Sequence, residues 1–231
     1  MLLLVALAVC DAGPYGVARA ANAQASNAIA ILYADGPFVR SYSASTEMAL
    51  PRIEKQHSWY AVWLMLVNNG GNPPGFVQGG LIRWSAQKYH LSAFIALARP
   101  DHELVFKDLG RVPEGPHHVE LSGNAKEVWF LVDGKLRYRF KRSRYLTNEL
   151  HPYLQIGAEV KYPPDRASGT VWNLQLKKDR DMHAGGFMPH CTYEDRGLSF
   201  VRRGAAFVAK GRFKPNMPSN FTNCAGFNQG K

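Results

Sequence analysis

The sequence lacks the patterns that identify several common architectures. Over its 231 residues, apolar side chains nowhere recur at the spacing of a long amphipathic helix, and no internal repeat is evident. The apolar run Leu2–Val9 is too short to cross a bilayer as a helix. These absences argue against a helical bundle, a repeat solenoid and a membrane span formed by this run.

Cysteine is scarce, with three residues in the chain. Cys191 and Cys224 lie far apart and neither belongs to a Cys-x-x-Cys pair, so the usual zinc signatures are absent. An even pair in an exported protein predicts a disulfide. A Cys191–Cys224 bridge would close a loop of about 34 residues and stabilise the fold by roughly 3–4 kcal/mol.

Residues 1–25 have the composition of a signal peptide or a disordered export segment. The run Leu2–Val9 precedes a small-residue site at Ala18-Arg-Ala20, although the usual positive n-region is missing. Cys10 is placed as in a bacterial lipoprotein box, but Val9 stands where Gly, Ala or Ser is expected, which argues against lipid anchoring. We therefore expect a secreted or periplasmic, cell-envelope protein.

Acidic side chains are outnumbered, with 18 Asp and Glu against 28 Lys and Arg, which gives a net charge of +10. A basic protein favours acidic partners such as anionic polysaccharides, membrane surfaces or nucleic acids. Because export argues against nucleic acid as a physiological partner, the charge predicts an anionic polysaccharide or glycan. The oligomeric state is left open.

The chain has short β-rich segments about every ten residues, separated by Gly, Pro, Asn and Asp. The segment 59–67 is apolar on both faces, as expected of a central strand. Residues 26–179 are predicted to form a sandwich, and residues 180–231 a C-terminal extension packed on it. Strands are expected near residues 28–34, 59–67, 75–84, 91–98, 104–109, 117–121, 128–132, 136–141, 153–160 and 170–176.

The stretch from His117 to Lys135 carries the clearest structural motif. It predicts two strands followed by a tight turn at Asp133-Gly134, which supplies the positive φ angles of a two-residue hairpin loop. This hairpin resembles one that recurs in concanavalin A-like lectin/glucanase and laminin G-like sandwiches. The resemblance implies an all-β, two-sheet antiparallel jelly roll or β-sandwich. The Gly, Pro and Asn content and the two cysteines of residues 180–231 add a loop-rich, disulfide-stapled C-terminal extension. Many unrelated functions share that sandwich.

The acidic cluster that glucanases carry on this sandwich is missing. No Glu-x-Asp-x-x-Glu run exists, and Glu103 and Asp108 would fall on opposite faces of a straight strand, so glycosidase activity is unsupported. Asp101-His-Glu103 offers oxygen donors of the kind Ca²⁺ prefers, but without EF-type spacing. We expect no cofactor and no metal site.

Basic residues alternate along one predicted strand. Alternate residues of a strand share a face, which predicts a basic ladder of four cations and a core-facing row of Leu136, Tyr138 and Phe140. Guanidinium groups on such a ladder match carboxylate and sulfate geometry. The other interpretation is a solvated outer face whose charges block edge-to-edge pairing. The ladder consists of Lys135, Arg137, Arg139 and Lys141.

The segment Pro74-Gly-Phe-Val-Gln78-Gly also resembles the x-x-Gln-x-Gly strand of secreted glutamic peptidases, another β-sandwich family. That resemblance would make Gln78 one half of a Gln/Glu pair. The later strand Phe94–Ala98 has alanines where a Glu would be needed, which leaves Glu103 or Glu159 as the remaining candidates.

A polysaccharide lyase is a third enzyme class that fits the residue types. Lyases of anionic sugars neutralise a carboxylate and move a proton with a Tyr/His pair. Gln78, Arg83, Tyr89, His90 and Tyr153 are of the right kind, but the lyase family's motifs are absent.

The sequence therefore favours an exported, non-catalytic, lectin-like β-sandwich protein that binds an anionic glycan. The ligand is expected on a concave sheet face and its rim, with the basic ladder supplying the electrostatic part. No catalytic residues are assigned. The alternatives are a polysaccharide lyase, a glutamic peptidase-like enzyme and a cell-envelope protein-interaction module. The residues expected on the face and rim are Gln78, Arg83, Trp84, Tyr89 and His90.

Overall fold

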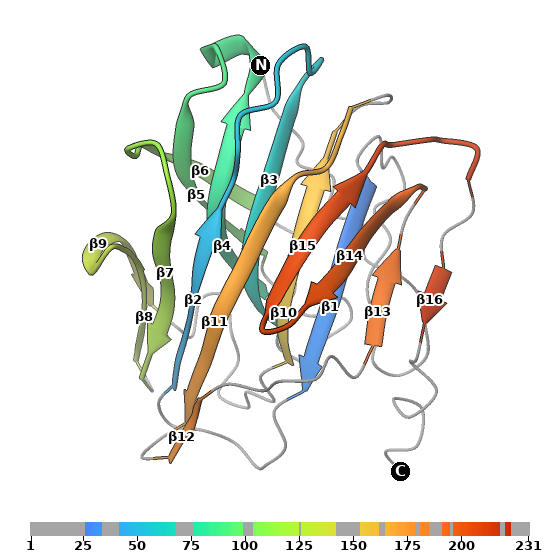
Figure 1. Cartoon of the computed structure of the whole chain (residues 1–231). Coiled ribbons are helices and arrows are strands. Elements are labelled where there is room, and N and C mark those ends of the chain that lie inside the picture. Colours follow the sequence, from blue (N-terminus) through green and yellow to red (C-terminus); the bar gives the residue numbers. More distant parts are fainter. Residues whose placement is uncertain are drawn as a thin grey trace.

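Two antiparallel sheets pack face to face and form a β-sandwich (Figure 1). The expected all-β fold is confirmed. Among the described residues, the helical structure is the 3₁₀ turn η2 (Ser85–Gln87), and none of their helices is long and apolar enough to cross a membrane. The computed structural model describes residues 26–33, 42–67, 76–98, 104–124, 126–141, 153–161, 165–178, 181–184, 191–194, 196–217 and 220–222.

The first sheet has the strand order β16-β13-β1-β10-β3-β4-β5-β6. Strand β10 pairs antiparallel with β3, although about ninety residues separate them along the chain. This pairing brings β10 next to the β3–β4 hairpin. The strands are β16 (Asn220–Thr222), β13 (Cys191–Glu194), β1 (Ser26–Tyr33), β10 (Tyr153–Val160), β3 (Trp59–Val67), β4 (Phe76–Trp84), β5 (Leu91–Ala98) and β6 (Leu104–Arg111).

The second sheet has the order β14-β15-β11-β2-β7-β8-β9, with β12 (Asp181–Ala184) paired to β11. The alternation of apolar residues did not predict β2, because its inward residues include the small Ala44 and the polar Thr46 beside Met48. The other strands are β14 (Leu198–Arg203), β15 (Ala206–Gly211), β11 (Gly169–Lys178), β2 (Tyr42–Ala49), β7 (His117–Gly123), β8 (Glu127–Val132) and β9 (Lys135–Lys141).

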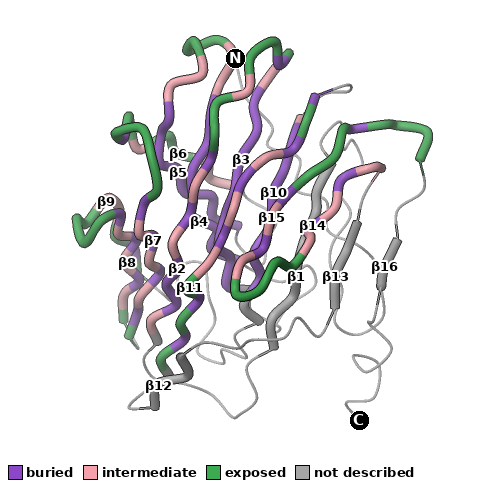
Figure 2. Tube along the Cα trace, in the orientation of Figure 1, coloured by how far each residue is buried: buried purple, intermediate pink, exposed green. Residues whose placement is uncertain are grey.

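The core lies between the two sheets and takes alternate residues of strands such as β3, β4, β5, β7 and β8. Val77 and Leu81 of β4 belong to it, together with Val128 and Phe130 of β8. The Phe130 ring occupies the space over Gly79, so a side chain at this glycine would overlap it. The central strands of the first sheet are buried along nearly their whole length, whereas β7 and β8 alternate between buried and half-buried residues (Figure 2). Both faces of β4 and β5 are therefore shielded from water.

The hairpin from β7 to β9 forms as predicted. Asp133 and Gly134 have φ angles of 53° and 71° in the turn between β8 and β9. The buried His117 ring fastens this turn, since its Nδ1 lies 2.6 Å from the Asp133 carboxylate and its Nε2 lies 2.8 Å from the Pro113 carbonyl oxygen.

One prediction about β9 is wrong. Leu136 is not in the core: its side chain is 54% exposed. Leu131 pairs with Leu136 but its neighbour Phe130 pairs with Tyr138, so the register shifts by one residue at Arg137. A bulge of this kind reverses which residues face the core on its two sides.

The C-terminal residues contribute strands to both sheets, since β14 and β15 extend the second sheet and β13 pairs with β1 of the first. The boundary at residue 179 stays a prediction. Cys224 and residues 1–25 lie outside the described residues, so the disulfide and the export segment also stay predictions.

Candidate binding face

The face of the first sheet that points away from the second sheet, called here the outer face, is buried but is not part of the core. On β4 the outward residues include Gln78, Gly80, Ile82 and Trp84, because alternate residues of a strand share a side. Gln78 is 1% exposed, yet it does not belong to the apolar cluster between the sheets. Buried polar and aromatic side chains therefore lie on the outer face, apart from the apolar core between the two sheets.

The strand register aligns two amide side chains across this face. Met65 of β3 pairs with Gln78 of β4 on one side and with Gln155 of β10 on the other. Gln155 is also buried. Two strand spacings separate Gln78 from Gln155, which is about 10 Å.

Trp63 forms the floor beside this row. It pairs with Gly157 of β10 and Gly80 of β4, and its indole ring lies over Gly157. A Cβ atom at Gly157 would overlap the ring, so a glycine is required for this ring position. The ring consequently lies on β10 between Gln155 and Glu159, which flank Gly157 on the same face.

Glu159 is the acidic group of this face. It is 2% exposed and pairs with Ala61 of β3 and Asn27 of β1. Desolvation raises the pKa of Glu159 well above its ordinary value of 4.5. The carboxyl group is therefore held as a neutral acid over a wider pH range than an exposed glutamate.

Unpaired polar atoms concentrate on this one face. In the described part of the chain, seven buried polar side-chain atoms have no hydrogen-bond partner, and six of them belong to outer-face residues. Leaving such an atom unpaired costs about 1–3 kcal/mol, so native proteins keep few of them. The six are the Nε1 atoms of Trp59, Trp63 and Trp84 and the Oε1 atoms of Gln78, Gln155 and Glu159.

Aromatic rings extend the outer face toward β6. Trp59 lies 6.2 Å from Trp84, and Trp84 makes an edge contact with Phe106 at 5.7 Å between ring centroids. Phe106 stacks on Phe94 at 5.7 Å. The face thus combines a band of rings with the row of amides.

Arg83 does not lie on this face, which corrects the expected grouping. It is buried on the core side of β4, where its Nε donates to the Leu50 carbonyl and its Nη1 to the Tyr89 carbonyl. Its guanidinium also holds the carboxylate of Glu114 in a bidentate pair, and this hydrogen bond lowers the pKa of Glu114. Arg83 therefore fastens loops together and is not available to a ligand.

The other expected rim residues lie beyond the end of β4. Tyr89 is in the turn after η2 with a φ of 59°, and its hydroxyl donates to the Gln56 carbonyl at 2.6 Å. His90 is half-buried next to it. Gln78 and Trp84 share the outer face, but six residues of strand, about 20 Å, separate them. The predicted residues thus do not form one compact site.

The basic ladder lies on the other sheet. Arg139 and Lys141 pair with Trp129 and Glu127 on the outer side of β8, whereas Lys135 pairs with the core-facing Val132. Because of the bulge, the four cations are not aligned on one face as predicted. They are also separated from Gln78, since β9 is the edge strand of the second sheet.

The arrangement lacks the Gln/Glu pair of a glutamic peptidase. The residue in the row of Gln78 on β10 is Gln155, not a glutamate. Glu159 is four residues farther along β10, which places it about 13 Å along and about 10 Å across the sheet from Gln78. Glu103 and the proposed calcium donors lie outside the described residues. Among the described side chains, no three His, Cys, Asp or Glu residues gather as around a metal ion.

Sequence reasoning assigned no role at a site to Gln155 or Trp63, and it named Glu159 only as a remaining candidate for the glutamate of a peptidase pair. Gln155 and Glu159 alternate with Ile156 and Ala158 on β10, a pattern that predicts a strand with one polar face. The pattern does not show which strand lies beside β10. That information comes only from the pairing of β10 with β3.

No protein-family model and no curated protein matches the chain. Among solved structures, scytalido-glutamic peptidase with a peptide-based transition-state analog matches with a TM-score of 0.53 and 10% identity, over 82% of this chain and 100% of that one. SCP-B, an eqolisin-family peptidase in complex with a tripeptide, gives 0.50 and 9% over 82% and 100%. The alginate lyase AlyC3 gives 0.45 and 16% over 61% and 67%, a score too low to carry an argument. The likeness to the two peptidases shows the fold alone, an antiparallel two-sheet β-sandwich.

Proposed function

We propose that the protein is a non-catalytic carbohydrate-binding protein that holds an oligosaccharide against the outer face, across β10, β3 and β4. The observation that carries the proposal is the group of six buried polar atoms without partners on that face. These atoms are buried in the free protein, so a ligand must first expose the outer face to reach them. Its hydrogen bonds would then offset part of the cost of leaving the atoms unpaired.

A sugar fits the chemistry of these atoms. The indole N–H groups of Trp59, Trp63 and Trp84 need acceptors, and the side-chain oxygens of Gln78 and Gln155 need donors. A hydroxyl group serves as both. Tryptophan rings also stack on the apolar faces of sugar rings, and Trp63 lies between the amide row and Glu159.

The outer face is better suited to bind the hydroxyl groups of a sugar than to bind an anionic group. The described side chains that β10, β3 and β4 direct outward include no cation. The preference for an anionic glycan rested on the basic ladder, which belongs to the other sheet. We therefore propose that the outer face binds an uncharged stretch of glycan, and that export of the protein brings it to extracellular polysaccharide.

Peptidase activity is the less favoured assignment, although two solved neighbours are glutamic peptidases. Their identity to this chain is 9–10%, which supports fold and not activity. The row that contains Gln78 offers Met65 and Gln155, so it lacks a carboxylate to act as general base.

The test is a glycan array with neutral, uronate and sulfated polymers at low and high salt. We expect binding to a neutral polymer that salt leaves nearly unchanged. Gln78→Leu should weaken it by about tenfold, the value of one hydrogen bond. The matched control is Gln175→Leu, because Gln175 is exposed on β11 of the other sheet.

Two results would contradict the proposal. Binding that is restricted to acidic polymers and abolished by salt would mean that the ligand binds at the basic ladder and not at the outer face. If the wild-type protein bound no polymer on the array, the unpaired atoms would be internal to the fold and would have no role in binding a glycan. An enzyme would be recognised by turnover of a bound polymer that Gln78→Ala abolishes while leaving affinity measurable.

A further inference from the structure

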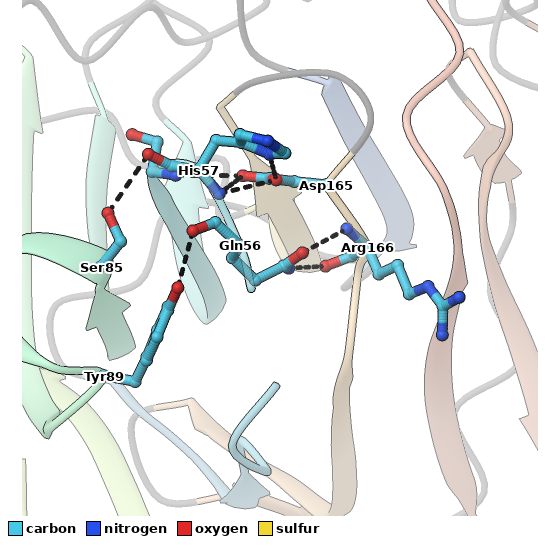
Figure 3. Close-up of polar contacts among 7 residues, drawn as sticks. Gln56, His57, Ser85, Tyr89, Asp165 and Arg166 are labelled. Carbon is cyan, nitrogen blue, oxygen red and sulfur yellow. Dashed lines mark hydrogen bonds and ion pairs between the residues drawn. The ribbon is translucent and has the colours of Figure 1, made fainter. Parts of the chain in front are cut away.

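A second group of polar residues surrounds the buried carboxylate of Asp165, between β10 and β11 (Figure 3). Asp165 is 1% exposed. Its Oδ1 accepts a hydrogen bond from the His57 backbone N–H at 2.8 Å, and its Oδ2 accepts one from the Ser58 N–H at 3.1 Å. The carboxylate thereby fixes the chain immediately before β3.

The amide of Gln56 fastens the same two loops a second time. Its Nε2 donates to the Arg166 carbonyl at 2.6 Å, and its Oε1 accepts from the Arg166 N–H at 3.0 Å. The Gln56 carbonyl in turn accepts the Tyr89 hydroxyl. The backbone around Asp165 is therefore held rigidly by side chains of three loops.

The loops held by Asp165 and Gln56, called here the frame, orient the imidazole of His57. The His57 Nδ1 lies 2.7 Å from Asp165 Oδ1, so Nδ1–H donates to the carboxylate (Figure 3). The ring is otherwise 62% exposed, which leaves Nε2 facing away from its partner. An imidazole held through one nitrogen presents the other in a fixed direction.

The residues of this frame line a cavity of about 390 Å³, a size typical of small-molecule sites. Three of its lining residues are cations. Of its two acids, Asp165 is already engaged by hydrogen bonds, and Glu54 is exposed. Lys55 has a φ of 63°, a left-handed conformation that a residue with a side chain rarely adopts. The lining residues are Ile53, Glu54, Lys55, Gln56, His57, Asp165, Arg166 and Arg212.

Two of the cations come from directly opposed backbone positions. Arg166 and Arg212 face each other in an isolated antiparallel bridge, which places their Cβ atoms about 5 Å apart. Like charges at opposed positions of a β pair destabilise it. A bound anion between the two guanidinium groups would reverse this repulsion, and guanidinium geometry suits carboxylate, sulfate and phosphate oxygens.

We propose that this cavity binds a small organic oxyanion, with the paired guanidinium groups of Arg166 and Arg212 on its charged group and His57 Nε2 as a second contact. A purely structural role for Asp165 explains the tied loops. It does not account for an oriented, exposed imidazole and an opposed arginine pair on the wall of the same cavity. The inference is independent of carbohydrate binding at the outer face, because the two sets of residues do not overlap.

The experiment follows the ring signals of His57 by NMR while the full chain is titrated with D-glucuronate, D-glucose or inorganic sulfate. Glucuronate and glucose differ by the carboxylate, so they separate recognition of charge from recognition of a sugar ring. Two double variants accompany the wild type. Arg166→Ala with Arg212→Ala removes the pair, and Lys126→Ala with Lys177→Ala removes the same charge from exposed residues with no assigned binding role.

We expect glucuronate and sulfate to shift the His57 signals saturably and glucose to leave them unchanged. Loss of the arginine pair should weaken glucuronate binding by at least about tenfold, or 1.4 kcal/mol. The Lys126 and Lys177 double variant should bind as the wild type does. The proposal is overturned if glucose acts like glucuronate, if both double variants lose the same affinity, or if the wild type responds to neither anion.

Discussion

Replacing Glu159 by glutamine should change how the stability of the protein depends on pH. Burial raises the pKa of this carboxyl above the ordinary value of 4.5, and no described side chain donates to its Oε1. In the unfolded chain the group loses its proton near the ordinary value. In the folded protein it keeps the proton to higher pH, so the folded state binds more protons between the two pKa values.

The sign and size of the effect follow from this difference. Below about pH 4.5 both states are protonated, and Glu159 adds no pH dependence. As the pH rises toward the folded pKa, the free energy of unfolding of the wild type falls by about 1.4 kcal/mol per pH unit on account of this group. Glutamine cannot release a proton, so Glu159→Gln removes that slope while keeping the side-chain volume.

Urea denaturation from about pH 4 to about pH 8 measures the difference in unfolding free energy between Glu159→Gln and the wild type. The difference should grow with pH in favour of the variant and then level off above the folded pKa. Glu127→Gln on β8, partly exposed, controls for the loss of one negative charge. A difference that stays constant across this range would refute the assignment of Glu159 as a buried neutral acid.

Three further variants test separate parts of the structure by urea midpoint. Gln78→Leu together with Gln155→Leu should raise stability by about 1–3 kcal/mol per site, since each removes a buried unpaired amide oxygen; a large loss would show that these amides are bonded. Asp165→Ala should cost about 1–3 kcal/mol, because it removes the acceptor of the His57 and Ser58 backbone N–H groups, and an unchanged midpoint would contradict its role in tying the loops. Gly157→Ala should cost about 1–3 kcal/mol through overlap with the Trp63 ring, and a neutral effect would mean that the ring lies elsewhere.

The sequence predicted most of the first sheet because its strands carry unbroken apolar segments and end at Gly, Pro or Asn. The turn at Asp133-Gly134 was likewise predictable, since few residue pairs adopt its positive φ angles. The bulge at Arg137 was not, because one inserted residue leaves the alternating pattern on either side intact while exchanging the faces.

The candidate site was predictable only in part. The outward position of Gln78 follows from alternation on β4, but the same alternation turns Arg83 toward the core, where carbonyl oxygens and Glu114 engage it. That Gln155 lies in one row with Gln78 depends on the pairing and register of β10 with β3. Pairing between strands so far apart in the chain is decided by packing of the whole sandwich and has no local signature.

The most direct test of the central claim is a tryptophan fluorescence titration with the oligosaccharide that binds best on the array. Trp63 is on the outer face beside the amide row, whereas Trp129 is on β8 of the other sheet. Binding at the outer face predicts a saturable change that Trp63→Phe largely removes and Trp129→Phe preserves. A change that survives Trp63→Phe at full amplitude and affinity, and disappears in Trp129→Phe, would place the ligand on the second sheet and contradict the account.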